Sequence, residues 1–267
     1  NIAKYAKIKG LDVLATGDCT HHIWMNELKK KLADNGNGIY SFQGVSFALT
    51  GEISLIYRQG DKGRRVHHMI YAPSFSVVDQ INEWLDKKGR RDYDGRPIFG
   101  FSSVEFVEAM MNISKDIEIV PAHAWTPWYG IFGSMSGFDS LEECFGDKTK
   151  HIHSIETGMS SDPAMNWRIS ALDNITLTSN SDAHSFWPWR LGREANVFDL
   201  GDGFSYGDIM DAIRARKNFA YTIEVDCNYG KYHIDGHRLC NFSCMPEESK
   251  KLNGICPKCG RALTIGV

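Results

Sequence analysis

The sequence predicts an α/β fold with a parallel sheet. Short apolar runs that suit buried strands recur along the chain, the first of them over residues 11–16 (LDVLAT). Between them lie segments with apolar residues at helical spacing, most clearly Val77, Ile81, Trp84 and Leu85. Strands that alternate with helices favour parallel pairing, because each helix returns the chain to the same edge of the sheet.

The predicted elements cover most of the chain in alternating order. Strands are expected over residues 11–16, 45–50, 53–57, 66–71, 117–120, 152–155, 175–178 and 219–223. Helices are expected over residues 2–8, 24–33, 77–87, 103–111, 163–172 and 206–216. These elements form one large domain over residues 1–224, and a small second domain is expected over residues 225–267.

Composition restricts the class of protein. The 267 residues are 42% hydrophobic and 24% charged, as in globular proteins. No run approaches the ~20 consecutive apolar residues of a membrane span, and the start lacks a signal-peptide pattern, so we expect a cytoplasmic protein without a membrane partner. The net charge of −3 neither requires nor excludes nucleic acid, and basic runs at 62–65, 87–91 and 214–217 are most simply exposed surface.

Side chains that bind metal ions lie at or near the ends of six predicted strands. The set comprises Asp18, His21, Glu52, His67, His68, His123, Glu156, Asp182 and His184. In a (β/α) barrel the carboxyl ends of the strands converge on one face, where catalytic groups lie. This donor set predicts two or three Zn²⁺, Mn²⁺ or Mg²⁺ ions, which suit hydrolysis of a phosphate ester. Any single histidine could instead be a hydrogen-bonded core residue.

These motifs resemble the PHP (polymerase and histidinol phosphatase) family of metal-dependent phosphoesterases. Asp182-Ala-His184 is similar to the family's final Asp-x-His ligand pair, Pro-Ala-His123 to its single-histidine motif, and Glu52 to its bridging glutamate. The strand histidine is His67 or His68, and the V-H-x-x-x-Y run favours His67. The resemblance implies a distorted seven-stranded (β/α) barrel with a metal cluster, in which Asp18, Glu52 and Asp182 are the catalytic carboxylates.

Two departures from the family pattern affect the ligand set. Cys19 stands where the Thr-Asp-His motif usually has histidine, so Asp18 or His21 would supply that bond. The family's opening His-x-His strand should precede Asn1, and the chain starts without Met and stops on an apolar run. We therefore expect a fragment that lacks this strand and a C-terminal region.

Longer segments resemble the endonuclease Q branch of that family. They include GLDVLATGDCTHHIW, PAHAWTPWYGIFGSMSGFDSLEECFGD and SNSDAHSFWPWRLGREANVFD. This resemblance implies a DNA repair endonuclease that cleaves 5′ of uracil, hypoxanthine or abasic sites. Its partners would be damaged DNA and other repair or replication proteins. The alternatives are a phosphomonoesterase for a small phosphate and a non-catalytic DNA-binding module.

The C-terminal cysteines independently predict a structural zinc ribbon. Cys240 and Cys244 form a C-x₃-C pair, and Cys256 and Cys259 form a C-x₂-C knuckle. Both spacings suit tetrahedral Zn²⁺. Cys227, His233 and His237 lie nearby, and His237-x₂-Cys240 is an equally suitable knuckle, so the first pair remains open.

Tryptophans near two of the candidate ligands suggest contact with a base. Trp125 and Trp128 follow His123, and Trp187 and Trp189 follow His184. Damaged bases can be read by rotating them out of the duplex into an aromatic pocket, which makes Trp125 and Trp128 candidate substrate-binding residues. The alternative is that these rings anchor their loops in the core.

Overall fold

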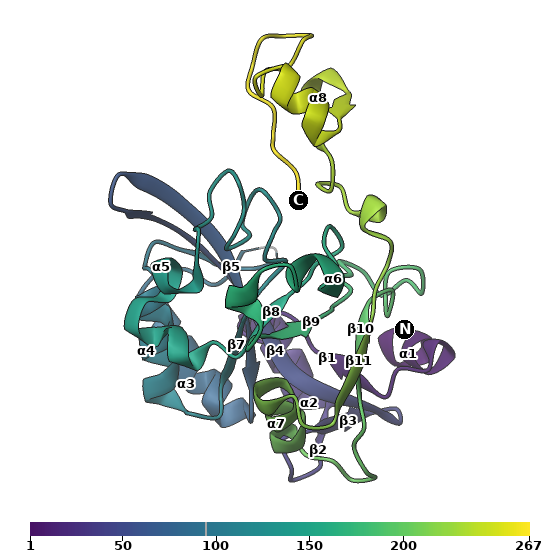
Figure 1. Cartoon of the computed structure of the whole chain (residues 1–267). Coiled ribbons are helices and arrows are strands. Elements are labelled where there is room, and N and C mark those ends of the chain that lie inside the picture. Colours follow the sequence, from purple (N-terminus) through teal and green to yellow (C-terminus); the bar gives the residue numbers. More distant parts are fainter. Residues whose placement is uncertain (94) are drawn as a thin grey trace.

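A long antiparallel hairpin forms the centre of the fold. In the computed structural model, which describes residues 1–93 and 95–267, strand β4 (Val45–Gln59) pairs with β5 (Lys62–Ala72) from Leu49↔Ala72 to Gln59↔Lys62. Figure 1 shows this hairpin extending beyond the remaining strands of the sheet. Its strands are rich in β-branched and aromatic residues, which favour the extended backbone.

The other strands of the main sheet assemble on this hairpin. β1 (Val13–Ala15) and β6 (Ile98–Phe99) pair in parallel with β4, whereas β3 (Tyr40–Phe42) pairs antiparallel with it. β2 (Ala33–Asp34) follows β3, and β7 (Glu118–Pro121) pairs antiparallel with β5. The sheet has seven strands in mixed directions, so the expectation of a parallel sheet is wrong for its central part.

Three two-stranded sheets complete the strand set of the described residues. β8 (Ser154–Glu156) and β9 (Thr176–Thr178) are parallel, and β10 (Ala195–Phe198) pairs antiparallel with β11 (Phe219–Ile223). β12 (Asp235–His237) and β13 (Phe242–Cys244) form a small hairpin near the C-terminus. The α/β class is confirmed, but the strands of residues 1–93 and 95–267 do not close into a seven-stranded barrel.

Helices pack around the main sheet (Figure 1). Their bounds are α1 (Ile2–Lys9), α2 (His22–Lys31), α3 (Phe75–Asp86), α4 (Ser103–Ile113), α5 (Leu141–Phe145), α6 (Pro163–Asn166), α7 (Tyr206–Ala215) and α8 (Pro246–Lys251). Serine begins several of them: the hydroxyls of Ser74, Ser102 and Ser205 accept backbone N–H groups of the first turn. 3₁₀ turns cover 146–151, 170–172, 227–229 and 238–240.

Most predicted elements are found, with two informative differences. The strands predicted over 45–50 and 53–57 are one strand, because Gly51 and Glu52 continue the ladder opposite Ile70 and Met69. The helix predicted over 163–172 is only α6 followed by a 3₁₀ turn. The sequence predictions also missed several elements that are too short to show a periodicity: β2, β3, β6, β10, β12, β13, α5 and α8.

The apolar core has separate parts. The largest cluster includes Ile53, Ile70, Ile81 and Phe106, all fully buried between the sheet and helices α3 and α4. A second cluster lies under α7, and a third is confined to Cys244, Cys256 and Leu263 with their neighbours near the C-terminus. In Figure 1 that C-terminal part projects from the body of the molecule. The domain boundary at 224/225 remains a prediction.

Among the residues that the structure describes, no helix combines the length and the apolar character needed to cross a bilayer.

A buried carboxylate connects α7 to β7. Glu118 has a fully buried side chain, and its oxygens accept hydrogen bonds from Arg214 Nε at 2.6 Å and His153 Nδ1 at 3.0 Å. Arg214 also donates to the carbonyl oxygens of Lys115 and Asp116. A buried charge requires such partners, because it has lost its hydration. Glu118 therefore holds three separate segments together.

We expect Glu118→Ala to lower the free energy of unfolding by about 3–5 kcal/mol, because it leaves Arg214 beside buried backbone without its counter-charge. The matched control is Glu108→Ala, which removes an exposed partner of Lys148 and should leave the free energy of unfolding nearly unchanged. Urea denaturation measures both values. Equal losses in the two variants would contradict the structural role assigned to Glu118.

Candidate metal centre

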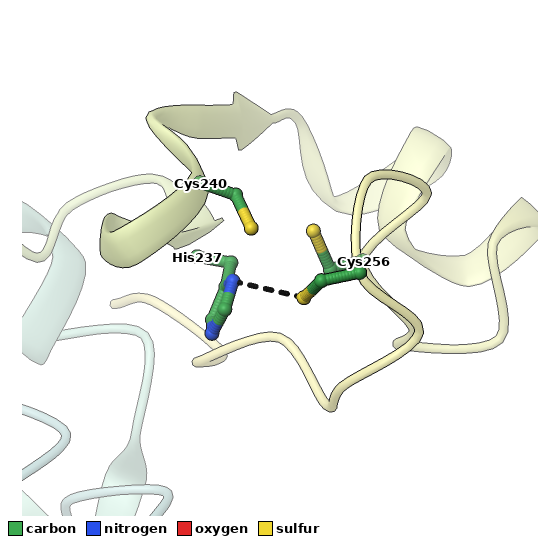
Figure 2. A group of neighbouring side chains, drawn as sticks. His237, Cys240 and Cys256 are labelled. Carbon is green, nitrogen blue, oxygen red and sulfur yellow. Dashed lines mark hydrogen bonds between the residues drawn. The ribbon is translucent and has the colours of Figure 1, made fainter.

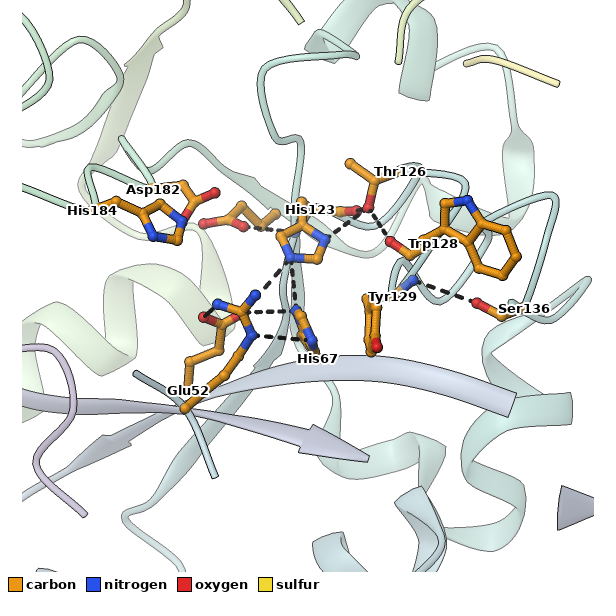
Figure 3. A network of polar contacts seen from close by, with 11 residues as sticks. Glu52, His67, His123, Thr126, Trp128, Tyr129, Ser136, Asp182 and His184 are labelled. Carbon is orange, nitrogen blue, oxygen red and sulfur yellow. Dashed lines mark hydrogen bonds and ion pairs between the residues drawn. The ribbon is translucent and has the colours of Figure 1, made fainter. Parts of the chain in front are cut away.

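Three donor side chains converge in the centre of the molecule. Glu52, His67 and His123 present one ligand atom each, and these atoms lie within 4.8 Å of one another. Glu52 Oε1 is 2.9 Å from His67 Nδ1 and 3.6 Å from His123 Nε2, and the two ring nitrogens are 3.1 Å apart. Figure 3 shows the three side chains pointing toward a common point. Such a group of donor atoms could hold a metal ion.

The register of the hairpin explains why Glu52 and His67 meet. Glu52 lies opposite Met69, and Ser54 lies opposite His67. Residues two apart on a strand, and residues opposite each other on paired strands, point to the same face. Glu52 and His67 therefore share one face from the middle of two antiparallel strands, so the expectation that strand ends deliver them is wrong.

His68 points to the opposite face and is fully buried. Its Nε2 is 2.9 Å from the hydroxyl of Ser103, and its ring packs against Phe106 and Phe145. Of the two neighbouring histidines, His68 is the core residue, and the geometry favours His67 as the candidate ligand.

The loop after β7 positions His123. The backbone N–H of Ala122 donates to the carbonyl of His67, which continues the ladder one residue beyond Pro121. His123 Nδ1 lies 2.8 Å from the hydroxyl of Thr126, which leaves Nε2 free to face Glu52. The backbone N–H of His123 donates to Glu156 Oε2 at 2.6 Å, and burial raises the pKa of Glu156 to about 7.

Arg96 contacts two of the three candidate ligands. Its Nε donates to His67 Nε2 at 3.1 Å, and its terminal nitrogen donates to Glu52 Oε2 at 3.0 Å. Because arginine can only donate, His67 Nε2 is an acceptor here, and a neutral ring carries its proton on Nδ1, toward Glu52. Arg96 therefore favours the tautomer of His67 that carries its proton on Nδ1, and it partly neutralises the buried carboxylate. A cation held by Nδ1 would require the other tautomer, so Arg96 would then have to turn away from His67 Nε2.

The protonation equilibria suit a ligand site. Burial opposes ionisation of Glu52, but hydrogen bonds from His123 and His67 outweigh it and hold the Glu52 pKa well below its usual range. Burial lowers the pKa of His67 to about 4, so this ring is neutral at pH 7. His123 is also buried, but its hydrogen bond to Glu52 and the charges of Glu52, Glu156 and Asp182 outweigh burial and raise its pKa.

The remaining candidate ligands lie around this group rather than within it. Asp182 Oδ1 is 2.9 Å from His184 Nε2, and both side chains are solvent-exposed. In Figure 3 this pair lies on the other side of His123 from Trp128. The charge of Asp182 acts on His123, and burial followed by the charge of Glu52 raises the pKa of Asp18. Asp18, Glu52 and Asp182 therefore lie close enough to the candidate metal centre for their charges to affect its groups.

The departure at position 19 is explained by burial. The Cys19 side chain is fully buried in the apolar core, and burial raises the pKa of its thiol, so it does not join the donor group. His21 stacks on His22 at the start of α2 and also lies outside the three-residue group.

Several candidate ligands have an uncommon backbone conformation. Asp18, His123, Asp182 and His184 have positive φ angles of 42°, 33°, 40° and 51°. Non-glycine residues adopt this region at a cost of about 1–3 kcal/mol and concentrate there at functional sites. The fold therefore maintains strained turns at four of the positions that the sequence singles out.

The donor set fits a metal ion. Two imidazoles and one carboxylate are the protein ligands of many catalytic zinc sites, which leave coordination positions open for water and substrate. Glu52, His67 and His123 match that composition, and Asp18, Asp182 and His184 are near enough to influence them electrostatically. Their individual roles as ligands remain predictions.

A second donor group lies in the C-terminal part. His237, Cys240, Cys256 and Cys259 place their ligand atoms within 4.8 Å of one another, and Figure 2 shows the imidazole and thiols facing inward. His237 Nδ1 is 3.4 Å from Cys259 Sγ. Although desolvation opposes it, the backbone N–H groups of Lys258 and Cys259 lower the pKa of the Cys256 thiol. Four such ligands form a closed set, typical of structural zinc.

Cys244 is not part of this second group. Its side chain is buried in the small C-terminal core beside Leu263. Cys227 lies near Met165, and His233 Nδ1 is 2.9 Å from the carbonyl of Ser160, so neither joins the group. The geometry favours the His237-x₂-Cys240 alternative over the C-x₃-C pair.

The two candidate substrate-binding tryptophans contact the protein itself. Trp125 Nε1 donates to Asn166 Oδ1 at 2.7 Å, and its ring packs on Phe132 at the edge of the main core. Trp128 lies under the guanidinium of Arg65, 5.3 Å from the ring centroid. For Trp125, the structure favours the packing alternative.

The sequence predictions missed Arg96 and Tyr129. Arg96 follows a charged run with Arg90 and Arg91, and nothing in the sequence distinguishes it from them. Tyr129 stacks on His67 with ring centroids 4.3 Å apart. Its position in the aromatic loop after His123 could have indicated that Tyr129 lies beside the candidate ligands.

Comparisons with known proteins identify relatives of this fold. No protein-family model matches the chain. A crystal structure of endonuclease Q with a 27-mer duplex substrate carrying an abasic lesion at the active site aligns with a TM-score of 0.87 and 33% identity, covering 99% of this chain and 64% of that one. The lesion-specific endonuclease PfuEndoQ from Pyrococcus furiosus aligns with a TM-score of 0.83 and 33% identity, covering 99% and 63%. PsfC from Pseudomonas syringae shares only the fold, with a TM-score of 0.51 and 16% identity over 84% of this chain and 81% of that one.

Two further relatives are known by sequence. The uncharacterized protein MJ0043 of Methanocaldococcus jannaschii is 34% identical over 67% of this chain and 22% of its own length. The uncharacterized protein YqxK of Bacillus subtilis is 25% identical over 95% of this chain and 64% of its own length. The chain thus spans less than two thirds of these relatives. The predicted resemblance to endonuclease Q is confirmed.

The two C-terminal ligand assignments can be separated by substitution. We expect His237→Ala to lose one bound zinc per chain, because it opens a closed set of four ligands. Cys244→Ser should keep that zinc and only weaken the small core. Zinc content by mass spectrometry measures both, with Cys256→Ser as the control that removes a ligand common to both assignments. Zinc loss in Cys244→Ser but not in His237→Ala would restore the C-x₃-C pair.

We expect Trp125→Ala to lower the free energy of unfolding by about 3 kcal/mol, because it removes a packed ring and its hydrogen bond to Asn166. Trp125→Phe keeps most of the packing and should recover more than half of this loss. Thermal and urea denaturation provide the measurement. Unchanged stability in Trp125→Ala would indicate that the ring is available for substrate.

Proposed function

We propose that this endonuclease Q-like chain is the metal-dependent catalytic part of a DNA repair endonuclease. It would hydrolyse a phosphodiester bond at abasic sites and on the 5′ side of uracil or hypoxanthine. The observation that carries the proposal is the convergence of Glu52, His67 and His123 within the fold shared with endonuclease Q. One of those related structures holds a duplex with an abasic lesion at its active site.

The candidate metal site supplies the chemistry for this reaction. Ions held by Glu52, His67 and His123, with Asp18, Asp182 and His184 around them, would lower the pKa of a water and stabilise charge on phosphate oxygens. Glu52 Oε1 faces both histidines, so this carboxylate would hold an ion together with them. Asp18, Glu52 and Asp182 are the carboxylates that we propose take part in catalysis.

Arg96 suits the recognition of a phosphodiester. About a third of its side chain is exposed (34%), and its guanidinium already lies against Glu52 and His67. A planar guanidinium binds phosphate oxygens in a fixed geometry. On substrate binding, Arg96 would therefore neutralise the negative charge that the DNA backbone brings toward Glu52. A cytoplasmic location and contacts with other repair proteins remain predictions.

The direct test is cleavage of labelled duplexes that carry one abasic site, one uracil, one hypoxanthine or no lesion. With Mn²⁺, Mg²⁺ or Zn²⁺ supplied, we expect a nick at the three lesions and none in undamaged DNA. Glu52→Gln and Asp182→Asn should each slow cleavage by more than about 100-fold, because even outer partners of metal ligands contribute 10–100-fold. Glu105→Gln, which alters an exposed ion pair with Lys88, is the control.

Two outcomes would contradict the proposal. One is full activity in Glu52→Gln, which would remove this carboxylate from the site. The other is hydrolysis of a small phosphomonoester without any cleavage of damaged DNA, which would favour a phosphomonoesterase.

A further inference from the structure

An exposed stack of aromatic rings lies on the loop after His184. The indoles of Trp187 and Trp189 are nearly parallel, with an angle of 4° and centroids 5.2 Å apart. They are 42% and 64% exposed, respectively. Phe186 packs on Trp187, and Tyr5 of α1 stacks on Phe186. These four rings form one continuous stack, which we call the ladder. Single exposed apolar residues are common, whereas an ordered exposed stack requires an explanation.

Local structure makes this ladder rigid. The carbonyl of Trp187 accepts hydrogen bonds from the backbone N–H groups of Arg190 and Leu191 at 2.9 Å and 3.0 Å. Gly192 has a φ angle of +63° and packs so closely on Leu11 that a Cβ atom there would lie 2.9 Å from its side chain. Pro188 fixes its own φ between the two indoles. The two rings are therefore held in place before any ligand arrives.

Arg193 connects the loop that carries the indoles to the backbone at Ser181 and Asp182, beside the candidate metal centre. Its Nε donates to the carbonyl of Ser181 at 2.8 Å, and its terminal nitrogen donates to the carbonyl of Asp182 at 3.1 Å. The two ends of the loop that carries the indoles are thereby joined beside Asp182. A ligand on the indoles would sit on the same structural unit as this candidate catalytic carboxylate.

Two exposed cationic residues lie on the segments that carry the ladder. Arg190 is exposed next to Trp189, and the ammonium of Lys4 lies 6.0 Å from the ring centroid of Tyr5. Flat exposed rings flanked by cationic side chains are the combination with which proteins hold single-stranded nucleic acid, since the rings stack on bases and the cations meet phosphates.

We propose that Trp187 and Trp189 form a stacking platform for an unpaired nucleobase of DNA, with Trp189 in direct contact with the base. The inference rests on the proposed function and deepens it, because it names how DNA near the cleavage site is held. Any base has a flat face, so the platform would bind without regard to base identity. It would stabilise a base displaced from the duplex beside the lesion.

Binding of short oligonucleotides tests the platform without requiring catalysis. The probes are a fluorescently labelled single-stranded dT octamer and an octamer of the same charge built of abasic deoxyribose phosphates. We expect the protein to bind the dT octamer roughly tenfold more tightly than the abasic octamer, because one stacked base contributes about 1–3 kcal/mol. Trp189→Ala should remove this preference, and Trp189→Phe should retain part of it.

The matched control is Trp167→Ala. Trp167 is 67% exposed and is not among the stacked ring pairs of the described residues. That variant should keep the preference for the dT octamer, and thermal melts should show all variants folded. An unchanged preference in Trp189→Ala, or an equal loss in Trp167→Ala, would overturn the proposal. A shift in oligomeric state in Trp189→Ala with unchanged oligonucleotide binding would also overturn it, in favour of a protein interface.

Cleavage and octamer binding together distinguish a failure of the platform from a failure of the proposed function. If wild-type protein cleaves abasic duplexes but Trp189→Ala binds the dT octamer as wild type does, only the platform fails. If no duplex is cleaved with any of the three metals while the preference depends on Trp189, the platform stands and the endonuclease assignment fails.

Discussion

The antiparallel register between β4 and β5 is the constraint on which the rest of the candidate site depends. It places Glu52 and His67 on one face of the sheet and sends His68 into the core on the other. If β5 slipped by one residue, His68 would face Glu52 and His67 would face the core, because side chains alternate between the faces of a strand. The buried contacts of His68 with Ser103 and Phe106 oppose such a slip, so core packing also fixes the position of the polar group.

Electrostatics at this face follow from burial. A carboxylate that loses its hydration needs compensating partners, and Glu52 has His67, His123 and Arg96 around it. His67 is neutral because of burial, while His123 binds a proton more readily than usual because three carboxylates act on it. The site therefore combines several carboxylates with a few histidine and arginine side chains that donate hydrogen bonds to them. Such a concentration of carboxylates attracts metal ions. Strained turns at Asp18, His123 and Asp182 present the surrounding groups.

The two donor groups differ in how far apart their ligands lie in the sequence. The C-terminal group has four ligands from one short stretch of chain and encloses its centre, so a metal there would mainly contribute to folding. The central group gathers three candidate ligands from β4, β5 and the loop after β7, and the exposed pair Asp182 and His184 lies beside it (Figure 3). Ligands far apart in sequence can meet only after the domain has folded, which suits a site for reaction rather than for stability.

Local sequence patterns are enough to predict the α/β class, most of the helices, the types of donor residue and the resemblance to endonuclease Q. These follow from local periodicity and from motifs such as Asp182-Ala-His184, which need no knowledge of tertiary contacts. Contacts between distant segments were needed to show that the sheet is mixed, that Trp125 packs against Asn166, and that Arg96 contacts the candidate ligands. It also brought His237 rather than Cys244 to the C-terminal group, since both spacings are compatible with zinc. Strand direction and side-chain partners depend on which distant segments pair, and hydrophobic periodicity does not encode that choice.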